Sequence, residues 1–507
     1  MLDAVRTHAR SRPRKLACVD LESGRRMSYA ELDGEVDHTA AWLVQKLGPA
    51  SGARVATLAR SCDALLILQL AAIRAGAIFT PLNWRLTPAE IAGLLEDARP
   101  AILVHADEFS VPEFSGEPLT LAAFELAAHS APSRPPASAR RAATDPATLL
   151  YTSGTNGKPK GVIVTEENAF WGCINFILGN DVTHRSVFLC DMPMFHTAGL
   201  FAAIRSPLLA GATVLISRGF DAAKTLGRLA DPALEVTHYF SVPQMAQRLW
   251  QEPGFEPAML RGLTVYAMGG APNPPAQIER FVRAGIPMSD GFGMTETGSN
   301  FGMPFGDPEI LLNKAGSCGL PYLCVDARIV DESGRDVPDG ERGELWVRGP
   351  CVTPGYWNDP RLTREAFSDG WFRTGDIALR DPDGYYYLID RTKDMFISGG
   401  ENVYPAEVEA VLAELPQVAE AAVIGVPDAQ WGEVGRAYVV LAAGQALTAA
   451  DIQAYCRTRL ARYKTPASVV FADAIPRTAS GKVLKALLRA RAVAEKPLPY
   501  TNLRPPV

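Results

Sequence analysis

Residues 151–161 read Tyr151-Thr152-Ser153-Gly154-Thr155-Asn156-Gly157-Lys158-Pro159-Lys160-Gly161 and lie between two apolar, strand-like runs. The glycines allow backbone amides to turn toward an anion, and the hydroxyl groups can donate hydrogen bonds to its oxygens. The lysines balance negative charge that a neutral loop could not hold. This strand, loop and strand therefore predict a triphosphate-binding turn at the end of an α/β sheet, with ATP as the first ligand to expect.

The loop differs from the usual P-loop of kinases and GTPases. No Gly-x-x-x-x-Gly-Lys-Ser/Thr spacing can be read through it, and Pro159 stands where a helix would have to begin. A run of glycine, hydroxyl and lysine residues is also typical of an ordinary surface turn. Assignment of the loop to a nucleotide therefore needs support from the rest of the chain.

Length and composition restrict the class of protein. The chain has 507 residues, which is too long for one core and favours roughly two to four domains or subdomains. A formal net charge of −6 gives no broad basic face, so we expect no nucleic-acid partner. The eight cysteines occur without a Cys-x-x-Cys pair, so we expect them to be reduced and mostly buried.

The first residues predict neither a secretory signal nor a membrane anchor. Residues 1–15 carry several arginines but no apolar core, so we expect an amphipathic helix with a solvated basic face. An organelle transit peptide and weak peripheral contact with anionic lipid stay open as alternatives. The most apolar run, residues 64–73, is about half as long as a bilayer-spanning helix. We therefore expect a buried helix there, no transmembrane segment and a cytoplasmic location.

An α/β pattern runs through the first 320 residues. Short β-branched runs such as residues 54–58 and 101–104 alternate with apolar helical stretches. Residues 130–141 are rich in proline and serine and read as an internal loop before the strand at 148–151. Further strand-like runs occur at residues 213–216, 236–240 and 265–268. The pattern predicts a mostly parallel sheet covered by helices, with the site at its strand ends.

The pattern changes after residue 320. Strand-like runs flank turn sequences such as Ser333-Gly334, which predicts antiparallel hairpins up to about residue 390. Beyond Arg391 an α+β pattern begins, with Pro405 opening a helix. We therefore expect an N-terminal domain at residues 1–391, with an antiparallel β subdomain at about 320–390, and a small C-terminal domain at residues 392–507.

Five motifs follow the loop in a fixed order. They are Gly291-Phe292-Gly293-Met294-Thr295-Glu296-Thr297, Thr374-Gly375-Asp376, Asp390-Arg391-Thr392-Lys393-Asp394, Ser398-Gly399-Gly400-Glu401-Asn402 and Pro476-Arg477-Thr478-Ala479-Ser480-Gly481-Lys482. Each alone is typical of a turn, a helix cap or a solvated face. In this order they resemble the adenylate-forming superfamily of acyl-CoA synthetases, peptide-synthetase adenylation domains and beetle luciferases. One departure is Asn156, where the family usually has threonine, but an amide still donates to phosphate.

The resemblance implies a fold and a reaction. The fold is α/β, with a large N-terminal domain of mixed and parallel sheets, a β-barrel-like subdomain and a small mobile α+β C-terminal lid. A carboxylate is a poor electrophile, so the family first joins it to AMP, releasing pyrophosphate, and then transfers the acyl group to a thiol. ATP, Mg²⁺ and coenzyme A are the cofactors that the resemblance implies.

Catalytic roles also follow from the resemblance. Lys482 is expected at the α-phosphate, where a preorganised cation stabilises developing charge. Glu296 is expected to bind Mg²⁺ with Thr155 as a second ligand, because Mg²⁺ prefers oxygen, while Thr295 reaches the α-phosphate. His196 is expected to contact the acyl pocket or the adenylate.

The same motifs imply the nucleotide-binding residues. Asp376 suits the ribose hydroxyls because it only accepts hydrogen bonds, and Arg391 can donate to ribose or phosphate. The remaining candidates are Thr152, Ser153, Gly154, Thr155, Asn156, Gly157, Lys158 and Lys160 in the loop, Gly270, Ala271 and Pro272 in an adenine slot, and Asp290, Gly291, Phe292, Gly293 and Met294.

The resemblance further implies that the small domain moves between the two half-reactions. Lys393 falls at the hinge, and the loop Ser398, Gly399, Gly400 and Glu401 is expected to face the thiol tunnel in the second step. The hinge dihedral angles must then change between adenylation and thioester formation.

Substrate and acceptor are less sharply defined. Acetate-specific relatives have tryptophan where this chain has Gly293, so we expect a larger acid, either a medium or long fatty acid or an aryl acid such as a hydroxycinnamate. Tyr239, Phe240, Phe292 and Met294 are expected to line the acyl cavity. We expect coenzyme A as acceptor, with loading of a carrier protein as the alternative. A homodimer stays open, as does a degenerate nucleotide sensor.

Overall fold

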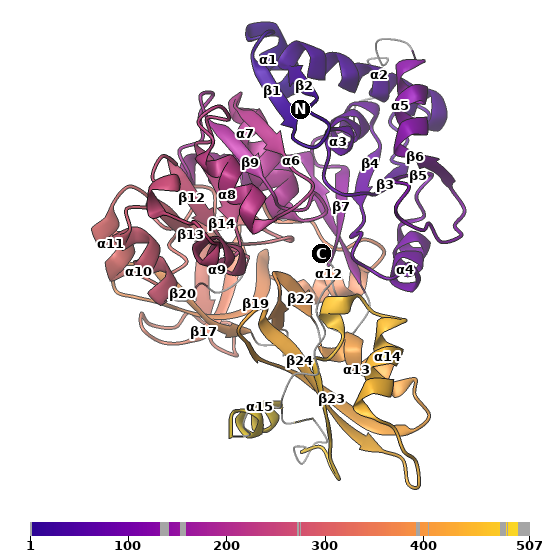
Figure 1. Cartoon of the computed structure of the whole chain (residues 1–507), viewed down its shortest axis with the longest axis vertical. Coiled ribbons are helices and arrows are strands. Elements are labelled where there is room, and N and C mark those ends of the chain that lie inside the picture. The colour runs from indigo at the N-terminus through magenta and orange to yellow at the C-terminus, as the bar shows by residue number, and fades with distance from the viewer. Residues whose placement is uncertain are drawn as a thin grey trace. The chain divides into compact units, whose positions relative to one another are not determined.

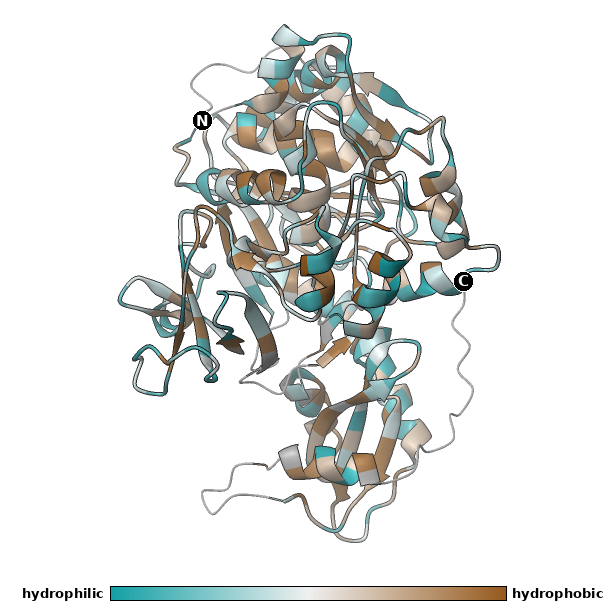
Figure 2. Cartoon of the chain, turned by 90° about the vertical axis from the view of Figure 1, so that its left-hand side faces the viewer, coloured by the Kyte–Doolittle hydropathy of each residue, from teal (hydrophilic) through white to brown (hydrophobic). Residues whose placement is uncertain are grey.

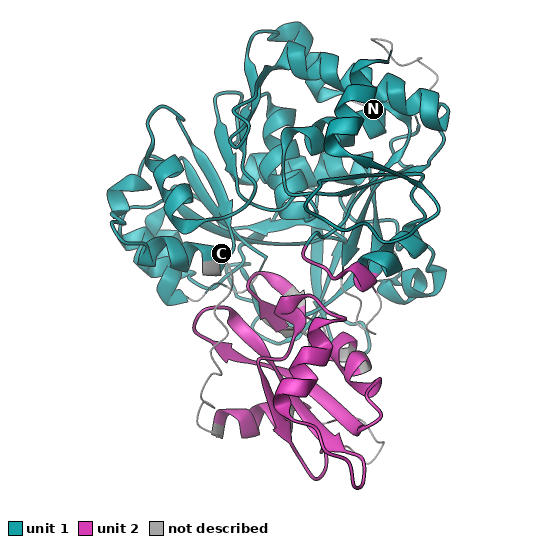
Figure 3. Ribbon diagram, turned by 45° about the vertical axis from the view of Figure 1, so that its right-hand side comes forward, with its two compact units in different colours: residues 1–84, 91–152, 160–392 teal, residues 85–90, 153–159, 393–507 magenta. Residues whose placement is uncertain are grey.

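The computed structural model describes residues 3–131, 141–152, 159–270, 273, 275–391, 396–403, 405–476, 483 and 485–494 (Figure 1). The chain divides into two compact units (Figure 3). The first comprises residues 1–84, 91–152 and 160–392, and the second comprises residues 85–90, 153–159 and 393–507. Both units combine helices with sheets, which confirms the predicted α/β class with a large N-terminal and a small C-terminal part.

The first unit contains a large, mostly parallel sheet. Among the described residues its nine strands follow the order β15 (Leu320–Pro321), β14 (Gly298–Gly302), β13 (Met288–Met294), β12 (Val265–Met268), β11 (His238–Ser241), β9 (Val187–Cys190), β10 (Thr213–Ile216), β1 (Leu16–Asp20) and β2 (Arg26–Ser28). The pairs from β1 to β13 are parallel, and the edges at β2, β14 and β15 are antiparallel. The predicted parallel sheet is thereby confirmed.

A second sheet carries the predicted phosphate loop. Its six strands in the described part of the chain are β6 (Glu117–Thr120), β5 (Ile102–His105), β3 (Arg54–Leu58), β4 (Ile78–Pro81), β7 (Pro146–Thr152) and β8 (Lys160–Thr165). Only β7 and β8 pair antiparallel. The strand predicted at residues 54–58 forms with those bounds, and the linker residues 132–140 lie outside the described residues.

Helices surround both sheets. Within the described segments up to residue 391 they are α1 (Ala4–Ser11), α2 (Tyr29–Leu47), α3 (Asp63–Ala75), α4 (Pro88–Ala98), α5 (Leu121–His129), α6 (Glu166–Gly179), the π-helix η2 (Ala198–Arg205), α7 (Ser206–Ala210), α8 (Ala222–Ala230), α9 (Pro243–Gln251), the 3-10 helix η3 (Pro257–Met259), α10 (Pro275–Arg283), α11 (Pro308–Asn313) and α12 (Pro360–Ala366). Local sequence starts α6 directly after β8, because Thr165 and Asn168 form a capping box.

The core lies on both faces of the large sheet. On β10, Val214 and Ile216 join one apolar cluster, whereas Leu215 joins another, because successive strand residues point to opposite faces. The first cluster also contains residues of the second sheet and of α3, and the second contains residues of α8 and α10. Figure 2 shows the apolar residues gathered along strands and packed helices. The buried helix predicted at residues 64–73 is α3.

The strands after residue 320 form a third, antiparallel sheet. Its five strands among the described residues are β16 (Asp326–Val330), β17 (Gly343–Arg348), β19 (Trp371–Arg380), β18 (Phe367–Ser368) and β20 (Tyr386–Arg391), which pairs with β19. Gly334, with φ of 76°, lies in the predicted turn between β16 and β17. Its backbone conformation is one that glycine adopts without strain.

The second unit has one sheet of its own. Where the structure describes this unit, the strands are β22 (Glu401–Val403), β21 (Phe396–Ser398), β24 (Gly432–Leu441), β23 (Val418–Asp428) and β25 (Ser468–Phe471). The helices in the same segments are α13 (Pro405–Ala413), α14 (Ala449–Arg457), the 3-10 helix η4 (Arg462–Lys464) and α15 (Lys485–Ala494). An apolar cluster within the unit packs the sheet against α13 and α14.

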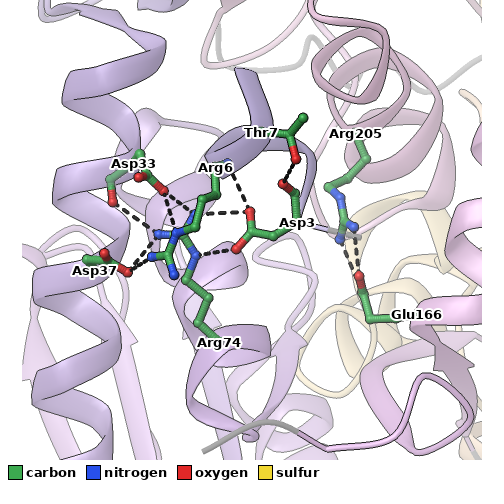
Figure 4. Close-up of polar contacts among 8 residues, drawn as sticks. All are labelled: Asp3, Arg6, Thr7, Asp33, Asp37, Arg74, Glu166 and Arg205. Atoms are coloured by element: carbon green, nitrogen blue, oxygen red, sulfur yellow. Dashed lines mark hydrogen bonds and ion pairs between the residues drawn. The ribbon is translucent and has the colours of Figure 1, made fainter. Parts of the chain in front are cut away.

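A network of ion pairs joins the start of the chain and α1 to helices α2 and α3 (Figure 4). Arg74 is 6% exposed and pairs with Asp3, Asp33 and Asp37, while Arg6 pairs with Asp33 and Asp37. The predicted solvated basic face of the first helix is therefore wrong at Arg6, because this guanidinium faces carboxylates of α2.

Two further predictions concern the membrane and the cysteines. Within the described residues, the helices lack the length and apolar character that crossing a bilayer requires. All eight cysteines carry free thiols, and all but Cys62 and Cys324 are buried. The prediction of reduced and mostly buried cysteines is confirmed.

Candidate active site

The predicted phosphate loop joins two paired strands. β7 and β8 place Thr152 opposite Lys160 and Tyr151 opposite Gly161. The Tyr151 hydroxyl donates to Asp97 at 2.6 Å, which fixes the end of β7. Ser153, Gly154, Thr155, Asn156, Gly157 and Lys158 lie outside the described residues. The structure therefore places the two ends of the loop, Thr152 and Lys160.

Lys160 reaches a buried carboxylate. Its Nζ lies 2.8 Å from Oε1 of Glu296 and donates at 3.0 Å to the hydroxyl of Tyr356. The Tyr356 hydroxyl in turn donates to the same Oε1 at 2.9 Å. Burial alone would raise the pKa of Glu296, but the Lys160 ammonium and the bonds from Lys160 and Tyr356 hold it below its ordinary value. Glu296 is therefore an ionised carboxylate with little access to water.

The turn that carries Glu296 is held by backbone contacts. It joins β13 to β14, and the amide of Thr353 donates to the carbonyl of Glu296 at 2.7 Å. Gly298 follows with φ of 65°, a left-handed conformation that favours glycine. Thr295, the predicted neighbour at the α-phosphate, is partly exposed beside it. The predicted pair Thr295 and Glu296 thus lies at the end of β13.

Tyr356 was not predicted from the sequence. It lies in the loop between β17 and α12, where an isolated bridge pairs it with Val162 of β8. Its amide donates to Oγ1 of Thr363 at 2.9 Å. These contacts bring the Tyr356 hydroxyl to Glu296. The sequence around Tyr356 contains no pattern that would predict them.

The site fits Mg²⁺. This ion is commonly bound by one or two protein carboxylates together with substrate phosphates. Glu296 supplies a hard, ionised oxygen, which accepts from the Lys160 ammonium and the Tyr356 hydroxyl. Thr155, the second predicted ligand, lies outside the described residues.

The predicted adenine slot lies at the ends of two parallel strands. β12 and β13 pair with Met268 opposite Asp290, so Gly269 follows beside Gly291. A Cβ on Gly269 would lie 3.1 Å from the carbonyl of Gly291, and Gly270 has φ of 81°. The missing side chains let the two backbones approach closely. Ala271 and Pro272 lie outside the described residues.

Asp290 is buried at this strand end. Its carboxyl accepts the amide of Gly291 at 2.9 Å. Burial outweighs the opposing influence of Gly291 and Asn273 and raises the pKa of Asp290 to about 8. Burial therefore favours the protonated form of this carboxyl.

The predicted ribose residues lie opposite each other. Asp376 of β19 is paired across the sheet with Arg391 of β20. Asp376 is buried, and its amide donates to Oγ1 of Thr374 at 3.0 Å. For Arg391 the structure describes the backbone alone. A buried acceptor at Asp376 agrees with the chemistry expected for binding two hydroxyls.

Cys318 is buried in the first unit. Its Sγ donates to the carbonyl of Tyr386 at 3.3 Å. Burial raises the pKa of this thiol, and the negative charges of Asp290 and Asp376, when ionised, raise it further.

His196 lies at the start of η2. Its carbonyl accepts the amide of Leu200 at 2.9 Å, and its ring centroid is 4.6 Å from that of Phe195. The imidazole is partly exposed. His196 thus lies just before helix η2, and its side chain is not enclosed in the apolar core.

Tyr239 and Phe240, both predicted to line the acyl cavity, lie in different apolar clusters on opposite faces of the sheet. Phe240 approaches the adenine slot, since a Cβ on Gly269 would lie 3.4 Å from its ring. Tyr239 instead donates to Asp191 at 3.1 Å and packs on Tyr266 with ring centroids 5.3 Å apart. The prediction for Tyr239 is wrong because neighbouring strand residues face opposite sides of the sheet.

The hairpin of β13 and β14 explains why residue 293 is a glycine. Phe292 packs on Phe301 with centroids 6.0 Å apart, and Met294 packs beside this cluster. A Cβ on Gly293 would lie 2.3 Å from the carbonyl of Gly298. The close approach of β13 and β14 therefore requires glycine at this position.

The glycine-rich motif of the second unit forms a tight hairpin. Ser398 pairs with Glu401, and Gly399 and Gly400 have φ of 59° and 83°. The Gly399 amide donates to the carbonyl of Trp431 at 2.9 Å. A Cβ on Gly399 would lie 2.7 Å from the Trp431 ring. Lys393 and Lys482 lie outside the described residues.

Comparison with known proteins decides the family. The sequence model of the AMP-binding enzyme family matches residues 5–357, and that of the AMP-binding enzyme C-terminal domain matches residues 407–482. The chain belongs to the AMP-binding enzyme family.

Individual relatives cover almost the whole chain. A feruloyl-CoA synthase of Amycolatopsis is 41% identical over 92% of this chain and 94% of its own. A long-chain-fatty-acid–CoA ligase of Mycobacterium tuberculosis is 36% identical over 97% of this chain and 98% of its own. A structure of o-succinylbenzoate CoA synthetase from Bacillus subtilis matches with a TM-score of 0.88 at 31% identity, covering 97% and 99% of the two chains.

These relatives confirm the predicted resemblance and reaction class. The AMP-binding enzyme described here is an ATP-dependent acid–CoA ligase of the AMP-forming type. ATP, Mg²⁺ and coenzyme A are its cofactors and co-substrates.

Proposed function

We propose that this ligase activates an aromatic carboxylic acid of the hydroxycinnamate type in the site built around Glu296. The carrying observation is the buried Glu296 carboxylate, held ionised by Lys160 at 2.8 Å. This pair lies at the end of the strand hairpin that bears the phosphate loop. A triphosphate entering there meets an ammonium and a metal-binding carboxylate together.

In the first half-reaction the acid carboxylate attacks the α-phosphate of ATP and pyrophosphate leaves. Mg²⁺, when bound, neutralises phosphate charge and orients the leaving group. We assign Lys160 and the loop residues 152–158 to the phosphates, and Asp376 with Arg391 to the ribose. We assign Lys482 to the charge that develops on the α-phosphate, since such donors contribute most in dry sites.

In the second half-reaction the thiol sulfur of coenzyme A attacks the acyl carbonyl and AMP leaves. We assign the hairpin Ser398–Glu401 to guidance of the thiol, because its glycines expose backbone where a longer side chain would collide with Trp431. Lys393 serves as the hinge in this proposal. A change of hinge dihedrals between the steps lets one site serve both reactions.

The identities to known ligases support an aromatic acid. The feruloyl-CoA synthase shares more identity with this chain than the long-chain ligase does. Medium and long fatty acids are the competing substrates.

An acid panel tests the proposal. Ferulate, 4-coumarate, benzoate, octanoate and palmitate are offered with Mg²⁺ and ATP, and AMP is measured with and without coenzyme A. The hydroxycinnamates are expected to give the highest kcat/KM, and coenzyme A the thioester. A preference for palmitate overturns the substrate assignment, and turnover only with a phosphopantetheinylated carrier protein establishes the alternative acceptor.

We also propose a cytoplasmic enzyme whose first helix makes only weak contact with anionic lipid. The charge of Arg6 is already balanced by Asp33 and Asp37, which leaves less basic charge for a membrane. Flotation with phosphatidylserine vesicles tests this contact, and sedimentation equilibrium tests the homodimer that the sequence left open.

A further inference from the structure

The loop that carries His196 is held at its start by a buried carboxylate. Asp191 directly follows β9 and is 2% exposed. Its Oδ2 accepts hydrogen bonds from Oγ1 of Thr225 at 2.7 Å and from the hydroxyl of Tyr239 at 3.1 Å, and its Oδ1 accepts one from Ser217. These donors come from α8, from β11 and from the residue after β10, and β10 and β11 flank β9. The loop therefore leaves the sheet at a fixed point.

Ser61 holds the middle of the same loop from another part of the chain. The amide of Met194 donates to Oγ of Ser61 at 3.2 Å, and this hydroxyl donates to the carbonyl of Met192 at 3.5 Å. Ser61 is 3% exposed and lies between β3 and α3. One buried hydroxyl thus fixes backbone groups on both sides of Pro193.

The loop has little room to change its shape after these bonds. The amide of His196 donates to the carbonyl of Pro193 at 3.1 Å, and the His196 carbonyl accepts the amide of Leu200 at 2.9 Å. A Cβ on Gly199 would lie 2.2 Å from the Pro193 carbonyl oxygen, so η2 begins in close contact with the loop. A π-helix such as η2 is rare and is frequently found at functional sites. The backbone of His196 therefore follows that of residues 192–194.

Aromatic side chains join the same two segments. The guanidinium of Arg60 lies 4.4 Å from the ring centroid of Trp84, and the Trp84 ring packs edge-on against Phe195 with centroids 6.3 Å apart. The Phe195 centroid is 4.6 Å from that of His196. Contacts therefore lead from residues 60–61 to the imidazole by two routes, through the backbone of the loop and through these rings.

His196 lies at the edge of the sheet that carries the proposed nucleotide site. β9, β11 and β12 are neighbouring parallel strands, and the His196 loop and the Gly269 turn both follow carboxyl ends of these strands. Ligands of α/β sheets bind at that edge. Two strand spacings, roughly 10 Å, separate β9 from β12. A nucleotide with its base at Gly269 can therefore place its acyl group, rather than its base, near His196.

We propose that Ser61 is a positioning residue for the acid: through the backbone at Met192 and Met194 it holds the imidazole of His196 against the acyl group of the bound substrate. This inference rests on the proposed adenylation site and adds to it a residue outside the sequence motifs. Without the Ser61 hydroxyl the buried Met194 amide loses its acceptor, which favours a different backbone conformation. The imidazole then shifts, and a small shift of a group that positions the substrate lowers the rate.

Kinetics of the first half-reaction test the proposal. Pyrophosphate release is measured with the acid of the panel that gives the highest kcat/KM, first with the acid varied at saturating ATP and then with ATP varied. Ser61→Ala is expected to lower kcat/KM for the acid ~10-fold, the effect of one lost buried hydrogen bond, and to leave KM for ATP within about two-fold. Equal losses for both substrates, or no loss for either, would overturn the proposal.

Two further variants isolate the hydroxyl from the space that the side chain fills. Ser61→Thr keeps a hydroxyl, whereas Ser61→Val has nearly the same shape without one. We expect Ser61→Thr to retain most of the kcat/KM for the acid and Ser61→Val to lose as much as Ser61→Ala. If the threonine and valine variants lose equally, the hydrogen bonds of Ser61 do not position the loop.

A double-mutant cycle tests whether Ser61 acts through His196. Once His196→Ala has removed the imidazole, Ser61→Ala should lower kcat/KM for the acid no further, because the two residues act as one unit. Additive losses would contradict the positioning role.

Ser186→Ala is the matched control. Ser186 is also 3% exposed, and its Oγ accepts the amide of Thr183 at 2.9 Å, but it precedes β9 at the end opposite to Asp191. This variant should lower stability and leave kcat/KM for the acid unchanged, and a kinetic loss equal to that of Ser61→Ala would contradict the proposal. Failure of the proposed function differs from all these outcomes, because the wild type would then release no pyrophosphate with any acid.

Discussion

Nζ of Lys160 lies 2.8 Å from Oε1 of Glu296, with 17% and 5% of the two side chains exposed. A pair so withdrawn from water gains little net stability, but removal of one partner leaves an uncompensated charge. In the proposed function the carboxylate binds Mg²⁺ and the ammonium binds phosphate, so each charge gains a new partner when the nucleotide enters.

Replacing one member of this pair should reduce stability more than replacing both. We expect Lys160→Met and Glu296→Gln each to lower the free energy of unfolding by about 3 kcal/mol, the typical cost of an unpaired buried charge. The double variant should lose far less than the sum. Urea unfolding of the four proteins measures the cycle, and additive losses would show that the two charges are not coupled.

Loss of the Tyr356 hydroxyl should weaken metal binding. Tyr356→Phe removes a donor to Glu296 at 2.9 Å and an acceptor for Lys160 at 3.0 Å. We expect the Mg²⁺ concentration for half-maximal activity to rise ~10-fold, by the usual value of a hydrogen bond to a charged group. Titration of activity with Mg²⁺ at saturating ATP measures the shift.

Tyr29→Phe is the control for that experiment. Tyr29 is also buried, and its hydroxyl donates to the carbonyl of Ala212 at 2.7 Å, away from the strand ends of the site. It should lower stability without changing the Mg²⁺ requirement. If both phenylalanine variants need equally more Mg²⁺, the assigned role of Tyr356 is wrong.

The buried carboxyl of Asp290 should make the protein less stable as pH rises. Burial raises its pKa from 3.8 to about 8, so between these values the folded chain keeps a proton that the unfolded chain has released. The free energy of unfolding then falls by up to about 1.4 kcal/mol per pH unit from this group. Asp290→Asn should remove that contribution and be more stable than the wild type at pH 7. Chemical unfolding at several pH values measures both slopes, which should be identical if Asp290 is ionised in the folded state.

Lys482→Ala should impair formation of the acyl-adenylate and spare thioester formation. Without this cation, acyl-adenylate formation is expected to fall at least ~10²-fold, the cost of losing one charge-stabilising donor. Thioester formation from pre-made acyl-adenylate and coenzyme A should remain. Pyrophosphate exchange and a single-turnover thioester assay measure the two steps, and equal loss of both would remove Lys482 from its assigned role.

Lys393→Pro should have the opposite effect, sparing formation of the acyl-adenylate and impairing thioester formation. Proline fixes φ near one value, whereas a hinge must change its dihedral angles between the steps. We expect adenylation to continue and thioester formation to fail. Normal rates for both half-reactions would place the hinge at another residue.

Local pattern predicted most of the elements. The strands at Thr213–Ile216 and Val265–Met268 have the predicted bounds, because short β-branched runs between helical stretches leave few alternatives. The order of motifs also assigned Asp376 and Arg391 to one ligand group, and the two residues lie opposite each other in the sheet, while their ribose role stays a prediction. The features that the sequence predicted, short strands and ordered motifs, are therefore each encoded by a few neighbouring residues.

The missed features depend on contacts between distant segments. Tyr356 is 60 residues from Glu296 and 196 residues from Lys160, and its role follows from a bridge to β8. The sequence around Tyr239 does not show its buried partner, because Asp191 follows another strand, β9. The charge of Arg6 was read as solvated because Asp33 and Asp37 lie on a separate helix.

Exchange of label between pyrophosphate and ATP tests the activating step most directly. Purified wild type, Mg²⁺, ATP and radiolabelled pyrophosphate are incubated with hydroxycinnamates and a wider set of organic acids, without coenzyme A. We expect label to enter ATP only when a suitable acid is present, and Glu296→Gln to abolish this exchange. Folded wild-type protein that shows no acid-dependent exchange across the whole set would contradict activation of an acid as its adenylate.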